Sequence, residues 1–338
     1  MILFHLPQLC RNQGLPYFLD APIFNRGVEA VYMFFVLSGY LIIRIVFIKK
    51  QANTFSIRKF YIRRILRIFP LYYLIVIFGF LYYWWILPQL NIPFQNNYPL
   101  EKGILLTTFF LPNVLAFEYA PGGVLEVLWS LGIEEQFYLV IAPLLFIINK
   151  KFVLVFLILL TSIYFSIYHF DYIEILRKYR FVYFLLFFGG IIAILEEKNQ
   201  LSFLKKHSLF PLSISILTLL YFTTDIFKFE NIMYYNFVTM VLFGLFIHVL
   251  SENNRGIQIK NKFFNYLGKI SYGIYVFHII SLNFVVFLML KIQEFNLLND
   301  TVIILTTYFL TFAITIIISH LSYQYVESYF LKLKGKYK

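Results

Sequence analysis

The chain has 338 residues, of which 60% are hydrophobic and only 14% are charged. Soluble globular domains carry roughly 25% charged residues, so the composition excludes a soluble globule and predicts a polytopic membrane protein. The net charge of +12 would suit a nucleic-acid partner, but basic residues in a membrane chain mark cytoplasmic loops. If spans alternate from residue 27 after an outer start, 21 of the 29 basic residues are cytoplasmic, which argues against nucleic acid. The single cysteine, Cys10, excludes an internal disulfide.

About ten apolar segments predict an all-α, polytopic transmembrane helical bundle. Residues 1–7 look like the last turns of a span that is truncated, since a helix needs about 20 residues to cross the hydrocarbon. The segment 88–126 is the longest connection between two expected spans. Its apolar part, 104–117, is interrupted by Pro112. We expect that part to dip in from the outer face or to lie along it, within one membrane domain over 1–330 and a basic cytoplasmic tail over 331–338. The other expected spans are 27–48, 65–87, 127–148, 152–169, 181–195, 209–226, 233–250, 267–290 and 301–323.

Four segments contain distinctive sequence motifs. They are FFVLSGYL (34–41), RRILRIFPLY (63–72), WSLGIEEQFY (129–138) and LGKISYGIYVFH (267–278). In this order they resemble the acyltransferase-3 family of membrane O-acyltransferases, which includes bacterial glycan O-acetyltransferases. The resemblance extends from His5 to Glu327, but Tyr329 stands where the family has a proline. The family also has an arginine about three helical turns before the histidine, and here that position precedes Met1, so we expect an upstream start or a defective copy.

The resemblance implies that His5, near the outer end of its segment, is catalytic. A neutral imidazole can take the proton of an acceptor hydroxyl while that oxygen attacks a thioester carbonyl. The spacing of Ser130, Glu134 and Tyr138 places them on one helical stripe, with Glu134 as the expected orienting partner of His5. Glu135 points to another side of the helix. The alternatives are an interfacial histidine without a role and glutamates that only pair with arginines to hold the bundle together.

A basic turn at the cytoplasmic mouth of the 65–87 segment is the expected binding site for acyl-CoA. Its residues are Arg58, Arg63, Arg64 and Arg67. A guanidinium group can make two parallel hydrogen bonds to a phosphate, so arginine binds the pyrophosphate and 3′-phosphate of coenzyme A better than lysine does. The alternative is ordinary anchoring of a cytoplasmic loop by positive charge.

A further polar stripe, formed by Ser271, Tyr275 and His278, could line a passage for the pantetheine arm or could be a packing seam. The expected substrate-path residues are Ser38, Ser130, Glu135, Tyr138, Ser271, Tyr275 and His278. His169, His207 and His248 fall in or beside expected loops and receive no role. The chain shows no His/Cys cluster, Gly-rich phosphate loop or nucleophile elbow, so no metal site and no permanently bound cofactor are expected.

The resemblance implies a multi-pass enzyme of the inner membrane. It would move an acyl group, expected to be acetyl, from cytoplasmic acyl-CoA to a hydroxyl of a cell-surface or secreted glycan. Its partners would be acyl-CoA, the glycan acceptor and the lipid bilayer. A transporter of glycans or lipid-linked sugars, or a non-catalytic relative, is the alternative, because polar stripes within a membrane also suit a translocation path.

Overall fold

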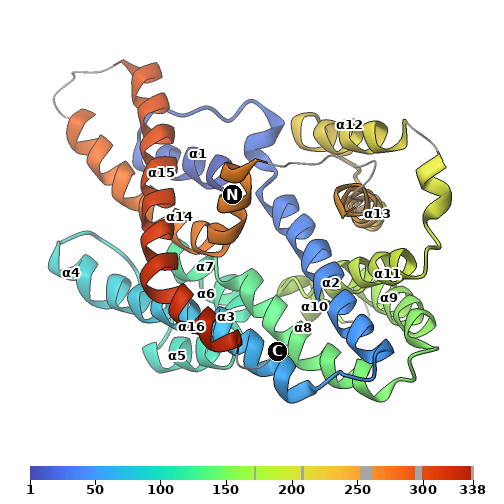
Figure 1. Ribbon diagram of the computed structural model, residues 1–338. Helices are drawn as coiled ribbons and strands as arrows, with labels where there is room; N and C mark the ends of the chain where they lie inside the picture. The colour runs from blue at the N-terminus through green and yellow to red at the C-terminus, as the bar shows by residue number, and fades with distance from the viewer. Residues whose placement is uncertain (171–172, 207–208, 252–260, 294–298, 336–338) are drawn as a thin grey trace. The chain divides into compact units, whose positions relative to one another are not determined.

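The computed structural model describes residues 1–170, 173–206, 209–251, 261–293 and 299–335, and all regular elements in these ranges are helical (Figure 1). The described chain forms two compact units. The first unit comprises Met1–Gly27, Tyr61–Trp129 and Lys260–Lys338, and the second unit comprises Val28–Phe60 and Ser130–Ile259. The helical fold class predicted from the sequence is confirmed.

The first unit contains the two ends of the chain. Its elements are α1 (Ile2–Gln13), η1 (Pro22–Asn25), most of α3 (Ile57–Leu81), η2 (Tyr82–Ile86), α4 (Leu87–Gln89), α5 (Leu100–Thr108), α6 (Pro112–Tyr119), α7 (Gly123–Glu126), α14 (Lys262–Gln293), α15 (Asp300–Ser322), η4 (Tyr323–Glu327) and α16 (Ser328–Lys334). The stretches η2 and η4 are π-helical turns within longer helices.

The second unit contains the middle of the chain. Its elements are α2 (Gly27–Gln51), α8 (Trp129–Ile147), α9 (Val153–His169), α10 (Glu174–Lys178), α11 (Tyr183–Glu197), η3 (Ser202–Lys206), α12 (Phe210–Thr223) and α13 (Ile232–Ser251). The first turn of α3 also belongs to it.

Six helices in the described ranges are long and apolar enough to cross a membrane. They are Gly27–Gln51, Ile57–Gln89, Gly123–Ile147, Ile232–Ser251, Lys262–Gln293 and Asp300–Lys334. Each overlaps an expected span, although several helices are longer than the span. The expected spans 152–169 and 209–226 correspond to the shorter apolar helices Val153–His169 and Phe210–Thr223. The chain is therefore a multi-pass membrane protein, but the count of about ten spans is not confirmed.

The excursion 88–126 is broken into short helices. α5 ends before Phe110, which has a positive φ of 57°, and α6 begins at Pro112. Proline suits a first helical position because it has no N–H to leave unpaired there. Ala120 and Gly122 also have positive φ, so the chain turns again before α7. The expected interruption at Pro112 is confirmed.

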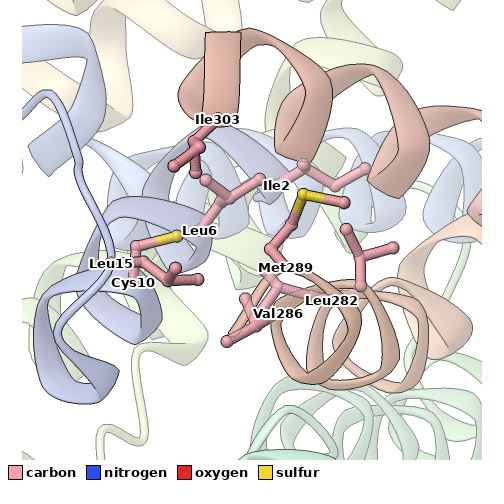
Figure 2. Packing of buried hydrophobic residues seen from close by; sticks show 9 residues of the cluster. Ile2, Leu6, Cys10, Leu15, Leu282, Val286, Met289 and Ile303 are labelled. Carbon is pink, nitrogen blue, oxygen red and sulfur yellow. The ribbon is translucent and has the colours of Figure 1, made fainter. Parts of the chain in front are cut away.

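An apolar cluster holds α1 against α14 and α15 in the first unit (Figure 2). Ile2, Leu6 and Cys10 are four residues apart and therefore share one face of α1. This face packs on Leu282, Val285, Val286 and Met289 of α14 and on Ile303 of α15. Van der Waals packing of these side chains holds α1 against the two longer helices, although α1 has only 12 residues.

In the second unit, glycines let α2 and α11 approach closely. A Cβ atom on Gly39 of α2 would lie 1.9 Å from the carbonyl oxygen of Leu186. A Cβ atom on Gly189 of α11 would lie 2.0 Å from the carbonyl oxygen of Val36. Small residues at such contacts are the usual device for bringing membrane helices together.

Candidate active site

Two histidines from opposite ends of the chain lie together in the first unit. The ring centroids of His5 on α1 and His278 on α14 are 5.4 Å apart, with an angle of 41° between the ring planes. The contact follows from the packing of α1 on α14, since His278 precedes Leu282 by one turn on the face that meets α1. His5 is partly exposed, and its ring also packs edge-on against Phe4 at 4.9 Å.

His278 is 1% exposed, and its two ring nitrogens have different surroundings. Nδ1 lies 2.5 Å from the backbone carbonyl oxygen of Tyr275, which can only accept a hydrogen bond. Nε2 is buried and has no hydrogen-bond partner among the described residues. The structure thus brings His278 to the expected catalytic histidine, a pairing that the sequence did not predict.

The other polar residues of this α14 stripe join helices. The Tyr275 hydroxyl donates a 2.8 Å hydrogen bond to the Val127 carbonyl, and its ring centroid is 5.9 Å from that of His278. Ser271 is exposed and bonds to the Gly268 carbonyl of its own helix at 3.0 Å. Tyr275 therefore has the contacts of a packing seam, whereas Ser271 is not brought to the histidines.

Tyr272, the neighbour of Ser271, links α14 to the basic turn of α3. Its hydroxyl donates to the Ile68 carbonyl at 3.0 Å, one residue beyond Arg67. His278 follows Tyr272 by six residues, which is about 9 Å along a helix that rises 1.5 Å per residue. The histidine pair and the basic turn thus belong to one unit and are joined through one helix.

The basic turn contains more cations than the sequence motif suggested. Lys334 of α16 interacts electrostatically with Arg64, Arg67 and Arg63, and these four residues are called the basic cluster below. Like charges repel when they gather, and a bound anion would relieve that repulsion. Arg58 lies on the exposed first turn of α3, in the part that belongs to the second unit.

A carboxylate accompanies the basic cluster. Glu327 is buried at the end of η4 and interacts electrostatically with Arg67. Its Oε1 accepts a hydrogen bond from Ser322 at 3.4 Å and lies on the side of α14 where Gly273 leaves room.

In the second unit, three expected site residues form a hydrogen-bonded set, the Glu134 triangle. The hydroxyls of Ser38 and Tyr138 both donate to Oε1 of Glu134, and the two hydroxyl oxygens are 2.8 Å apart. All three side chains are buried. Hydrogen bonds to a carboxylate are among the stronger ones, so the triangle couples α2 to α8.

Ser130 and Glu135 are also buried on α8, with exposed fractions of 1% and 5%. The expected stripe of α8 therefore supplies Glu134 and Tyr138 to one cluster. His5 belongs to the first unit and Glu134 to the second, so their pairing stays a prediction.

A second polar cluster in the second unit was missed at the sequence level. His248 Nδ1 donates to Oε2 of Glu196 at 3.0 Å, and Ser251 donates to the same oxygen at 2.8 Å. The Tyr40 hydroxyl donates to Oε1 of Glu196 at 2.9 Å, and Arg44 pairs with Glu197 at 2.7 Å.

His248 lies in the last turn of α13, beside the end of the helix as expected, but it is only 2% exposed. An ionisable residue within the expected span 233–250 was the available signal. His169 is the last residue of α9. Its Nδ1 donates to the Phe165 carbonyl at 2.7 Å, so its Nε2 accepts from the Asn236 side-chain amide at 2.9 Å. His207 lies outside the described residues. Within the described ranges, no group of three His, Cys, Asp or Glu side chains could hold a metal ion.

Comparison with known proteins identifies the family. A family model described as an acyltransferase domain matches residues 1–320. A Haemophilus influenzae protein named "Uncharacterized protein" is 31% identical over 253 residues, which cover 66% of this chain and 98% of that protein.

Two further relatives have names that state an activity. The Staphylococcus aureus "Putative O-acetyltransferase SACOL0978" is 29% identical over 94% of this chain and 54% of its own length. The Listeria monocytogenes "Peptidoglycan O-acetyltransferase OatA" is 27% identical over 93% of this chain and 53% of its own length. This chain spans about half the length of these two relatives, and no solved structure matches it. The chain belongs to the acyltransferase-3 family, as its motifs predicted.

Proposed function

We propose that this protein is a multi-pass O-acyltransferase of the inner membrane that moves an acetyl group from cytoplasmic acyl-CoA to a hydroxyl of a cell-surface glycan. The family match supports acyl transfer, and the name of the Listeria relative supports a glycan acceptor. The observation that carries the proposal is the occurrence, in one unit, of the basic cluster and the histidine pair.

The basic cluster supplies what coenzyme A requires. Three guanidinium groups and one ammonium group can bind a pyrophosphate and a 3′-phosphate. Arginine suits this role because its guanidinium group makes two parallel hydrogen bonds to phosphate oxygens. The carboxylate of Glu327 interacts electrostatically with Arg67 and favours the presence of that guanidinium near the cluster.

The histidine pair supplies the proton chemistry. His5 takes the proton of the acceptor hydroxyl while the hydroxyl oxygen forms a bond to the thioester carbonyl carbon. The carbon–sulfur bond then breaks, and His5 returns the proton to the departing thiolate, which leaves as coenzyme A. The products are the O-acetylated glycan and free thiol, and His5 ends the cycle neutral.

The spacing along α14 favours direct transfer. Tyr272 contacts α3 beside the basic cluster, and His278 is about 9 Å further along the helix. The hydrocarbon layer is about 30 Å thick, so the donor arm would have to pass only part of it to reach the histidines.

The test is thioester turnover by the purified protein in detergent or liposomes. Release of the coenzyme A thiol from acetyl-CoA should depend on the protein and should increase when a glycan acceptor is added. A His5→Ala variant should bind acetyl-CoA but release no thiol above background. If the wild-type protein binds glycan or moves it across a vesicle membrane without consuming thioester, the transporter interpretation replaces this one.

A further inference from the structure

We propose that His278 is the positioning residue for His5, holding its ring and its tautomer by accepting a hydrogen bond from a ring N–H of His5. This inference rests on the proposed function and assigns His278 a role other than lining a path for the donor arm. It begins from the 5.4 Å separation of the two ring centroids.

The tautomer of His278 follows from its neighbours. The carbonyl oxygen of Tyr275, 2.5 Å from Nδ1, has no hydrogen to donate, so Nδ1 of a neutral ring must carry the proton. Nε2 then has a lone pair and is an acceptor. Because this atom is buried without a partner among the described residues, it is a base that lacks a donor.

His5 is the donor that its surroundings favour. Its ring is adjacent to that of His278, and it is only partly exposed. At this centroid separation, two ring nitrogens that face each other can come within hydrogen-bond distance. The edge-on contact with Phe4 and the seating of α1 restrict the alternatives for His5.

The consequence for catalysis is a fixed direction of proton transfer. If one nitrogen of His5 donates to His278, its other nitrogen must carry the lone pair that receives the hydroxyl proton. When His5 becomes an imidazolium, the same hydrogen bond becomes charge-assisted and therefore stronger. His278 keeps its own proton throughout, so it positions and stabilises His5 without reacting.

Two amide variants distinguish this role from a structural one. The amide of asparagine in His278→Asn can replace Nδ1 and donate to the Tyr275 carbonyl, but it leaves nothing at the position of Nε2. The longer amide in His278→Gln can place an accepting oxygen near the position of Nε2. We expect His278→Asn to lower kcat by about tenfold to a hundredfold with an unchanged KM for acetyl-CoA, and His278→Gln to keep more of the activity.

A purely structural role predicts the opposite order, with His278→Asn active and His278→Gln impaired. That result, or equal wild-type kcat in both variants, would overturn the proposal while leaving acyl transfer established. Absence of thioester turnover in the wild-type protein would overturn both. His320→Asn on α15 is the matched control, since His320 bonds to Tyr266 elsewhere in the same unit, and its kcat should not change.

A measurement on the unaltered protein covers the case in which the variants do not fold. Nitrogen-15 NMR of histidine-labelled protein reports which ring nitrogen is protonated. We expect His278 to be protonated at Nδ1 and His5 to show a single tautomer. A mixture of tautomers at His5 would contradict the proposal.

Discussion

The four arginines of the basic turn are equivalent in the motif but not in the structure. Arg63, Arg64 and Arg67 interact with Lys334, whereas Arg58 is exposed on the first turn of α3. Phosphate binding needs cations that converge on one point, and anchoring at a membrane surface does not. The two roles of these arginines can therefore be separated residue by residue.

Replacing either Arg64 or Arg67 by alanine should raise the Kd for acetyl-CoA at least tenfold, because a charge-assisted hydrogen bond contributes about 1.5–3 kcal/mol. Lysine at either position should restore binding only in part, since an ammonium cannot make the forked contact. Isothermal titration calorimetry measures the effect, and Arg58→Ala is the control with a smaller change. If the Kd is unchanged in folded Arg64 and Arg67 variants, these residues only anchor the loop at the membrane surface.

Lys334 offers an independent test of the same cluster. Lys334→Ala should weaken acetyl-CoA binding, whereas Lys332→Ala, an exposed lysine on the same helix, should not. The comparison removes one charge from α16 in each case, so only the location differs. Equal Kd values for the two variants would exclude Lys334 from the donor site.

Sequence spacing predicted contacts within a helix better than contacts between helices. Glu134 and Tyr138 meet because residues four apart share a helical face. The same reasoning put Ser271 with His278, yet Ser271 is exposed and Tyr272 makes the contact to α3. Which face of α14 is covered depends on helices far away in the sequence, and no spacing rule contains that information.

At the scale of helices, long apolar runs predicted the main spans, because an uninterrupted run of about 20 apolar residues is stable in hydrocarbon only as a helix. The partners of each helix could not be predicted in this way. α1 meets α14 through four-residue spacings that are individually common. Lys334 was assigned to a basic tail because its interaction with the arginines of α3 joins residues far apart in the sequence.

The contact between α2 and α11 should be sensitive to a single methyl group. Gly39→Ala and Gly189→Ala should each destabilise the protein by about 1–3 kcal/mol, since the added Cβ meets backbone oxygen and cannot be accommodated by a rotamer change. Thermal unfolding in detergent measures the loss as a lower Tm.

Gly268→Ala on α14 is the matched control for these variants. A Cβ atom at Gly268 meets nothing within 4 Å, and alanine favours the helix by roughly 0.5–1 kcal/mol over glycine. Its Tm should stay the same or rise. A similar fall in Tm for all three variants would indicate that helix–helix approach at Gly39 and Gly189 is not the cause.

For the whole molecule, the charge distribution predicts one orientation in the membrane. Reporter fusions after Lys50 and Lys151 should lie in the cytoplasm, and a fusion near Asn96 should lie on the outer side, because basic residues are retained on the cytoplasmic face. Paired cytoplasmic and exported reporters at each site give the measurement. A cytoplasmic result at Asn96 would overturn the orientation and, with it, the access of cytoplasmic acyl-CoA to the basic cluster.

The two units each contain one of the expected catalytic residues, so joint action of His5 and Glu134 can be tested by double substitution. If they act together, His5→Ala and Glu134→Gln should each abolish most acetyl transfer, and the double variant should be scarcely worse than either single one, since groups that work as a unit are strongly non-additive. The Kd for acetyl-CoA should stay near the wild-type value in all three, because neither residue belongs to the basic cluster.

Additive losses in kcat would show that Glu134, with Ser38 and Tyr138, only supports the second unit. The orientation of His5 would then depend on His278 without a contribution from the Glu134 triangle.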